Sequence, residues 1–233
     1  MKAVLFDLDD TLYPEITFVK SGFKAVASYL RLQCKNLGYG EQDIFDKLMQ
    51  YLKIYGRGKV FDYFLNGFDL DVEYYVPLLV HAYRTHALDI SLYPGAATVL
   101  QNLRCRGFAL GIITDGMASV QKRKLEALGL KKMVDVIICT DEIGKDFWKP
   151  STIPYKIALD YLNVRPGRAI YVGNDITKDF IGARAINMHT VQIKHKNVAA
   201  QDEEGIGDAY KADYVIHALG EIYEILNCLK LDM

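Results

Sequence analysis

Three carboxylates follow a short apolar run at the start of the chain, in the sequence MKAVLFDLDDTLYP. The run ends at Phe6, and Asp7, Asp9 and Asp10 come directly after it. In an extended segment, side chains two residues apart point to the same face, so we expect Asp7 and Asp9 to lie side by side with Asp10 facing the other way. Two neighbouring like charges raise the free energy of the fold unless something compensates them, and the pair therefore indicates a chemical role.

Polar residues also follow three later apolar runs. They are Thr114 with Asp115 and Gly116, then Lys149, and then Asn174 with Asp175 and Asp179. Each has an ordinary structural interpretation on its own: Asp175 can cap the helix expected after it, and Thr114 can lie in a turn. Ligands of an open parallel sheet bind outside the carboxyl ends of the strands, so polar groups at four successive strand ends indicate one site.

Most of this set is acidic. We expect Asp9 to carry a proton and the other aspartates to be ionised, namely Asp7, Asp175 and Asp179. Lys149 supplies one positive charge, so the cluster stays net negative and a divalent cation would neutralise it. Aspartate oxygens without nearby His or Cys favour a hard ion, usually Mg²⁺.

The remaining groups of the set are donors. The Thr114 hydroxyl, the backbone N–H groups of Asp115 and Gly116, and the Lys149 ammonium would surround an anion beside such a cation. The chemistry that this combination predicts is phosphoryl transfer.

The elements that must position these residues alternate between apolar runs and amphipathic stretches. The expected strands are 3–8, 108–114, 134–140, 168–173, 189–194 and 214–217, and the expected helices are 98–104, 118–128, 153–162, 176–186 and 219–229. Near-continuous Val, Ile and Leu runs are typical of parallel strands buried on both faces. We therefore expect an α/β fold with a Rossmann-like, doubly wound parallel sheet.

About a hundred residues separate the first two strands, and up to Ile90 they are helical in pattern. Their apolar stripes are Phe18, Val19, Phe23, Val26 and Leu30, then Ile44, Phe45, Leu48, Met49 and Leu52, and then Tyr74, Leu78 and Tyr83. A structureless loop of this length is implausible in a compact domain. We expect a helical domain over 14–90, inserted in a core made of 1–13 and 91–233.

Composition limits the partners. The chain has 28 Lys and Arg against 29 Asp and Glu, so no bulk charge attracts nucleic acid or an anionic membrane. No apolar run is long enough for a secretory signal or a membrane span, and the scattered cysteines lack metal-ligand spacing. We expect a cytoplasmic protein, a monomer or a homodimer, that acts on a small molecule.

These motifs resemble the haloacid dehalogenase-like hydrolase superfamily, most of whose members are Mg²⁺-dependent phosphatases. The first motif is Asp7-Leu8-Asp9-Asp10-Thr11, the second is Thr114, the third is Lys149 in WKP, and the fourth is GNDITKD at 173–179. The resemblance covers essentially the whole chain, and the insertion resembles the α-helical cap of the family's first cap subclass.

The resemblance implies a mechanism. Asp7 would attack phosphorus and form an aspartyl-phosphate, and Asp9 would protonate the leaving oxygen and then activate water. Lys149 and Thr114 would stabilise the transferring oxygens, with Thr11 in support. The pair then lies together because one carboxylate must be ionised while the other holds a proton.

The implied Mg²⁺ site consists of Asp7, the backbone carbonyl of Asp9, and Asp175. In the commoner fourth motif an Asp directly follows the glycine, whereas Asn174 holds that place here and Asp175 follows. Asn174 or Asp179 could share the metal through water. Asp179 is otherwise expected to orient Lys149 or a metal-bound water.

Three alternative functions remain to be weighed. A 2-haloacid dehalogenase needs no proton for its leaving halide, so Asp9 argues against it. A sugar-phosphate mutase would keep every residue named above. A phosphoacceptor switch domain would be shorter and would lack the cap.

The sequence says least about the substrate. Tyrosines are frequent between Tyr13 and Tyr83, and their ordinary role is to pack the inserted domain. Some of them, with Arg57 and Lys59, could instead contact an anionic or aromatic substrate. A nucleoside monophosphate or a sugar phosphate fits that description.

Overall fold

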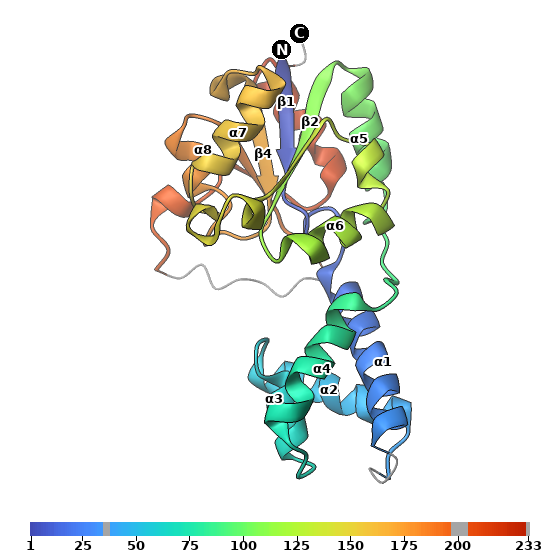
Figure 1. Cartoon of the computed structure of the whole chain (residues 1–233). Coiled ribbons are helices and arrows are strands. Elements are labelled where there is room, and N and C mark those ends of the chain that lie inside the picture. The colour runs from blue at the N-terminus through green and yellow to red at the C-terminus, as the bar shows by residue number, and fades with distance from the viewer. Residues whose placement is uncertain (35–37, 197–204, 232–233) are drawn as a thin grey trace. The chain divides into compact units, whose positions relative to one another are not determined.

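A six-stranded parallel sheet organises the larger part of the chain (Figure 1). The computed structural model describes residues 1–34, 38–196 and 205–231. The strands are β1 (Lys2–Phe6), β2 (Phe108–Thr114), β3 (Val136–Cys139), β4 (Ala169–Gly173), β5 (His189–Ile193) and β6 (Tyr214–Ile216). Their order is β3-β2-β1-β4-β5-β6, which is a doubly wound arrangement and confirms the expected fold class.

The order places β1 between β2 and β4. Phe6 is in register with Ile112 of β2 and with Val172 of β4, so residues after Phe6 emerge between two neighbouring strands. The direction of winding reverses at β1, and in such sheets this reversal marks the crevice where ligands bind. Asp7 is the first residue beyond this point.

Five helices accompany the sheet. They are α5 (Ala96–Cys105), α6 (Ala118–Ala127), α7 (Ile153–Leu162), α8 (Ile181–Ala185) and α9 (Ile222–Cys228). Helix α7 packs its apolar side against the sheet, where Tyr155 and Leu159 join Leu5 and Ile113 in one buried cluster. Burial of these side chains fixes α7, and with it the segment that carries Lys149 just before it.

One expected helix is much shorter than predicted. The apolar pattern at 176–186 predicts a continuous helix, but α8 begins only at Ile181 and residues 176–180 form turns. The cause is Asp179, whose carboxylate accepts the backbone N–H groups of Asn174 at 3.1 Å and Asp175 at 2.8 Å. These bonds fold the segment into a tight loop instead of a helical first turn.

The chain divides into two compact units, residues 1–14 with 91–233 and residues 15–90. We call the first the core unit and the second the helical unit. The helical unit contains α1 (Glu15–Gln33), α2 (Glu41–Tyr55), α3 (Val60–Asn66) and α4 (Val72–Thr85). Its own hydrophobic core includes Phe23, Leu48, Phe64 and Leu79.

The third apolar stripe of this unit is only partly correct. Tyr83 packs against the core of the helical unit as expected, but Tyr74 is exposed. The other core residues of α4 are Tyr75, Val76 and Leu79. The short helix α3 was not predicted at all. Both errors reflect aromatic residues spread over more than one helix face, which weakens a 3.6-residue pattern.

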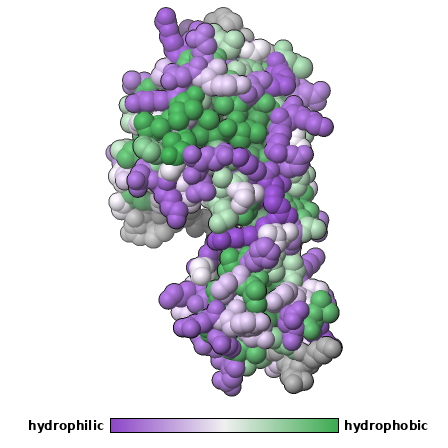
Figure 2. Space-filling view, viewed as in Figure 1, coloured by the Kyte–Doolittle hydropathy of each residue, from purple (hydrophilic) through white to green (hydrophobic). Residues whose placement is uncertain are grey.

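Apolar side chains also reach the surface. On the face of the core unit shown in Figure 2, they gather around α7, which exposes Ile157. Within the ranges that the structure describes, no helix is both long enough and apolar enough to span a membrane.

Candidate active site

Asp7 lies at the carboxyl edge of the sheet. Its backbone N–H donates to the carbonyl of Val172 in β4 at 2.8 Å, so the residue continues the pairing of β1 by one position. The side chain is almost fully buried. The central position of β1 therefore determines where this carboxylate points.

Lys149 connects three of the four predicted motifs. Its Nζ lies 2.5 Å from Asp7 Oδ1 and 2.8 Å from Asp179 Oδ1, and it donates to the Tyr171 hydroxyl at 3.1 Å. The Lys149 side chain is completely buried. Burial alone would lower the pKa of Lys149, but Asp179 and Asp7 outweigh it and raise the pKa well above its usual value, so the ammonium stays charged.

The same burial acts in the opposite sense on Asp7. Loss of solvent disfavours the carboxylate and raises the pKa of Asp7 to about 7, although the Lys149 ammonium lowers it and Asp179 raises it further. Asp7 is thus a carboxylate whose ionised form needs additional positive charge. A cation would supply this charge.

Asp9 has a separate set of partners. Lys124 Nζ lies 2.6 Å from Asp9 Oδ1, Gln121 Nε2 lies 2.7 Å from Asp9 Oδ2, and the Tyr13 hydroxyl also donates to Oδ1. Burial raises the pKa of Asp9, but Lys124 and the hydrogen bonds from Lys124, Tyr13 and Gln121 together lower it below its usual value. Asp9 is therefore ionised at neutral pH.

The charges of the protein itself change the expected protonation of Asp9. We expected Asp9 to be protonated, whereas its pKa is lowered. The physical reason is Lys124, a buried cation against Asp9 that the sequence reasoning did not assign. Asp7, which we expected to be ionised, has a pKa that burial raises to about 7, so its ionised form depends on nearby positive charge.

Gln121 joins Asp9 to Thr114. Its Nε2 lies 2.7 Å from Asp9 Oδ2 and 2.6 Å from Thr114 Oγ1. An ionised carboxylate only accepts hydrogen bonds, so the Gln121 side chain must turn its NH₂ group towards Asp9. The second hydrogen of that group then goes to Thr114 Oγ1, so the Thr114 hydroxyl directs its own hydrogen elsewhere, here to the carbonyl of Asp115 at 3.4 Å.

Asp115 and Gly116 hold the loop after β2. Asp115 Oδ1 accepts the Thr140 hydroxyl at 2.7 Å and the backbone N–H of Lys149 at 3.2 Å, so this side chain links the ends of β2 and β3 to the Lys149 segment. Gly116 has a φ of 105°, which other residues rarely adopt. The side chain of Asp115 thus has a structural role, and its backbone N–H remains part of the predicted anion site.

The fourth motif separates into three roles. Asp179 binds Lys149 and the backbone of its own loop, as described above. Asp175 Oδ1 accepts the Thr177 backbone N–H at 3.0 Å and the Thr177 hydroxyl at 2.7 Å, which is a capping arrangement. Asn174 Oδ1 lies 3.1 Å from Thr11 Oγ1, which itself lies 3.4 Å from Asp7 Oδ2. Asn174 is therefore connected to Asp7 through Thr11.

The possible metal ligands near Asp7 are oxygen atoms. They belong to Asp7, the side-chain amide of Asn174 and the loop that contains Asp175. Oxygen ligands suit Mg²⁺ better than a softer ion. Within the described ranges, no group of three or more His, Cys, Asp and Glu side chains could hold a metal.

A further cation, Lys178, lies beside this set. Its Nζ is 3.8 Å from Asp115 Oδ2 and 3.8 Å from Asp175 Oδ2. Burial and Lys149 both lower the pKa of Lys178, but the surrounding aspartates raise it above its usual value. Its charge adds to that of Lys149 and favours an anionic ligand.

The two residues predicted as substrate contacts of the inserted domain, Arg57 and Lys59, belong to the helical unit. Arg57 forms an ion pair with Glu15 at 2.6 Å. Lys59 is the N-terminal capping residue of helix α3, and its side chain makes no capping hydrogen bond.

Sequence reasoning missed several polar residues of the site, namely Tyr13, Gln121, Lys124, Tyr171 and Lys178. One signal was available for two of them. Gln121 and Lys124 are three residues apart on the helix that follows Thr114, so they share a face one or two turns from a strand end.

The sequence and the fold match a known family of hydrolases. A family model described as haloacid dehalogenase-like hydrolase matches residues 4–193, and the chain belongs to this family. It is 31% identical to the glyceraldehyde 3-phosphate phosphatase of Methanopyrus kandleri over the full length of both proteins. It is 33% identical to the phosphatase of the same name from Pyrococcus furiosus, over 97% of this chain and 93% of the relative.

Solved structures agree. A haloacid dehalogenase-type phosphatase from Thermococcus onnurineus superposes with a TM-score of 0.62 at 29% identity, covering 97% of this chain and 98% of the other. The chain is accordingly an enzyme, a phosphatase of the haloacid dehalogenase-like hydrolase family. Members of this class are generally metal-dependent.

Proposed function

We propose that this phosphatase hydrolyses the phosphomonoester of a small sugar phosphate, with Mg²⁺, through an aspartyl-phosphate on Asp7. The observation that carries the proposal is the buried contact of Lys149 with both Asp7 and Asp179 at the carboxyl ends of the strands. It places a permanent cation against a carboxylate whose other oxygen is available at the sheet edge. Such a pair supports attack on an anionic phosphorus centre.

The first step forms one bond and breaks another. An Asp7 oxygen attacks phosphorus, the bond from phosphorus to the ester oxygen breaks, and the leaving alkoxide takes a proton from Asp9. Lys149 and the Thr114 hydroxyl bind the phosphoryl oxygens, together with the backbone N–H groups of Asp115 and Gly116. In the second step water attacks phosphorus, Asp9 takes its proton, and Asp7 is released with inorganic phosphate.

Asp9 must exchange its proton during this cycle. Its ionised resting state, set by Lys124, suits the second step, in which it accepts a proton from water. The first step needs the protonated form. A phosphate dianion close to Asp9 favours that form because a neighbouring negative charge raises a carboxyl pKa.

Mg²⁺ would be held by Asp7, the backbone carbonyl of Asp9, and the fourth motif. When bound, it offsets the negative charge of the nucleophile and the phosphoryl oxygens. From the fourth motif, Asn174 supplies an amide oxygen on the side of Asp7, and Asp175 contributes a negative charge nearby. This proposal therefore replaces Asp175, the metal ligand expected from the sequence, with its neighbour Asn174.

A small sugar phosphate is favoured over a nucleotide by the named relatives. Whole-length relatives are named for glyceraldehyde 3-phosphate, and one from Halopiger xanaduensis, 29% identical, is a ribulose-1,5-bisphosphate 5-phosphatase. We therefore propose a triose or pentose phosphate as substrate. The helical unit would act as the cap that selects it, with Arg57 and Lys59 as candidate contacts.

The test is phosphate release from D-glyceraldehyde 3-phosphate, ribulose 1,5-bisphosphate, phosphoserine, AMP and p-nitrophenyl phosphate, each with Mg²⁺ and with EDTA. We expect turnover of the sugar phosphates that is lost with EDTA and in the Asp7→Asn variant. An isomerised sugar phosphate without phosphate release would identify a mutase instead. Equal rates on all five compounds would contradict the preference for sugar phosphates but would still agree with phosphatase activity.

A further inference from the structure

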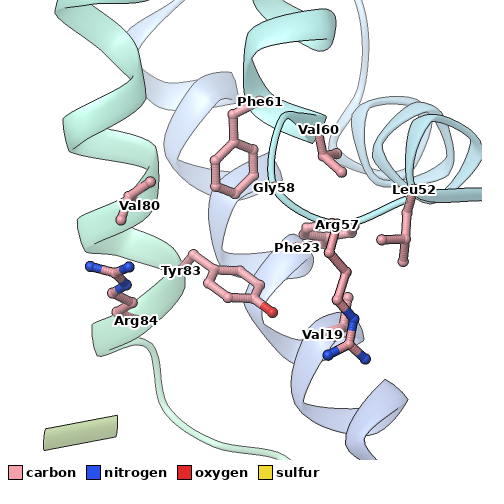
Figure 3. Close-up of a pocket in the computed structure, with 10 residues that line it drawn as sticks. All are labelled: Val19, Phe23, Leu52, Arg57, Gly58, Val60, Phe61, Val80, Tyr83 and Arg84. Carbon is pink, nitrogen blue, oxygen red and sulfur yellow. The ribbon is translucent and has the colours of Figure 1, made fainter. Parts of the chain in front are cut away.

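The helical unit contains a cavity of about 280 Å³ among its four helices (Figure 3). Its wall is formed mainly by apolar side chains, including Val19 and Phe23 of α1, Leu52 of α2, and Val80 of α4. The volume is near the lower end of the range found for small-molecule pockets. Its size therefore suits a ligand of one or two rings.

An aromatic wall gives the cavity a fixed shape. The Tyr83 ring packs edge-on against Phe18 with centroids 5.3 Å apart and against Phe61 at 5.9 Å. A Cβ atom at Gly22 would lie 2.5 Å from the Tyr83 ring, so glycine is needed for this ring to lie against α1. In Figure 3 the Tyr83 hydroxyl points towards Arg57, while the ring borders the cavity.

The loop between α2 and α3 brings a positive charge to the cavity. Gly56 and Gly58 have φ values of 70° and 111° and flank Arg57, so the two glycines allow the turn that lays Arg57 beside the cavity. Arg84 of α4 is a second arginine in the lining. The cavity is thus apolar within and positively charged at its border.

Glu15 is the acidic group that faces Arg57. The two side chains form an ion pair at 2.6 Å, in which the Arg57 side chain is 59% exposed and the Glu15 side chain 19%. Solvent on the Arg57 side screens the pair and limits its contribution to stability. An anionic ligand that reaches Arg57 would compete with the Glu15 carboxylate for the guanidinium.

We propose that this cavity is a binding site for a small aromatic carboxylate, whose ring fills the apolar space and whose carboxylate replaces Glu15 at Arg57. The planar guanidinium forms two parallel hydrogen bonds with a carboxylate, which favours this group over a neutral polar one. The site consists of residues of the helical unit alone, and this proposal gives Arg57 to the aromatic carboxylate in place of the substrate contact suggested above.

The test is calorimetric titration of the full-length protein with 2-naphthoate and, as the neutral counterpart, 2-naphthamide. We expect 2-naphthoate to bind at least tenfold more tightly. Arg57→Gln should weaken naphthoate binding about tenfold and leave naphthamide unchanged, because only the charge contact is lost. Glu15→Gln should strengthen naphthoate binding severalfold, since it removes the competing carboxylate.

Three controls make the result specific. Arg31→Gln removes an exposed arginine of the same unit outside the cavity and should change neither affinity. Val80→Trp fills the cavity and should abolish binding of both compounds. Saturating inorganic phosphate, which occupies the core site, should leave naphthoate binding unchanged.

The proposal is overturned by equal affinity for the acid and the amide, by no binding of either, or by displacement with phosphate. Displacement would show that naphthoate binds at the phosphatase site. Failure of the sugar-phosphate panel would leave this test unaffected, because the titration does not require turnover.

Discussion

Thr11 and Asn174 are hydrogen-bonded across the carboxyl edge of the sheet, with Thr11 Oγ1 3.1 Å from Asn174 Oδ1. Thr11 comes from the loop after β1 and Asn174 from the loop after β4, so this bond ties the first motif to the fourth. The neighbouring Asp175 uses Oδ1 to cap the turn at Thr177. In the proposed metal site, the residue that shares a cation with Asp7 is therefore a neutral amide, whereas Oδ1 of the adjacent carboxylate caps a turn.

This relationship predicts how the protein binds Mg²⁺. Asn174→Asp should tighten Mg²⁺ binding roughly tenfold, because a carboxylate replaces a neutral amide among hard-oxygen ligands. Asn174→Ala should weaken Mg²⁺ binding. Asp175→Asn should also weaken it, but by less than Asn174→Ala does. Calorimetric titration with MgCl₂ measures each affinity without turnover. A larger loss in Asp175→Asn than in Asn174→Ala would return the ligand role to Asp175.

Lys149 should be needed for stability as well as for catalysis. Lys149→Met leaves Asp7 and Asp179 buried without their shared cation, and breaking a buried pair in this way costs about 3 kcal/mol or more. We expect a correspondingly lower free energy of unfolding in urea and no measurable phosphate release. Lys145→Met, in the same segment but exposed, is the matched control and should behave like the wild type. An inactive Lys149→Met variant with unchanged stability would mean that Asp7 and Asp179 do not depend on this lysine for folding.

The fold could be predicted from the sequence because its signals are local. The strands β1 and β2 are nearly continuous apolar runs, and the positions of Asp7 and Thr114 follow from where those runs end. The prediction of a helix over 176–180 was wrong because the conformation of this segment depends on the Asp179 carboxylate, which accepts the backbone N–H groups of Asn174 and Asp175. Amphipathic pattern alone contains no information about such a bond.

The electrostatics of the site could not be predicted for a related reason. Lys124 lies more than a hundred positions from Asp9 in sequence, and only the packing of α6 shows that its ammonium faces Asp9. The protonated state expected for Asp9 omitted this buried lysine and was wrong. Residue types at strand ends indicate a site, but the pKa values depend on contacts that tertiary structure creates.

Gln121 should act on catalysis through Thr114. If its NH₂ group holds the Thr114 oxygen so that the Thr114 hydrogen can reach a phosphoryl oxygen, Gln121→Met removes that constraint. Loss of one charge-assisted hydrogen bond in the transition state lowers kcat by roughly tenfold or more. Thr114→Val removes the same donor directly, so we expect the double variant to be no slower than Thr114→Val alone.

A purely structural role for Gln121 gives a different pattern. The losses of the two single variants would then multiply in the double variant, and KM and thermal stability would change with kcat. Gln101→Met on α5, an exposed glutamine, is the control for the substitution itself. Steady-state kinetics of the wild type and the four variants on one sugar phosphate, together with inorganic phosphate inhibition constants, separate the two cases.

The close approach of α8 to the Lys149 segment gives a final prediction. A Cβ atom on Gly182 would lie 2.3 Å from the carbonyl oxygen of Pro150 and 3.0 Å from that of Ser151. These are backbone atoms, so they cannot move aside without shifting the chain next to Lys149. Gly182→Ala should therefore lower the free energy of unfolding by about 1–3 kcal/mol and reduce kcat, since Lys149 would move relative to Asp7.

Gly220→Ala is the matched control, because no atom lies within 4 Å of its added Cβ. Its free energy of unfolding should stay within about 0.5 kcal/mol of the wild-type value. Urea unfolding and kcat of both variants decide the matter, and a fully stable Gly182→Ala protein would show that α8 does not press on the segment that positions Lys149.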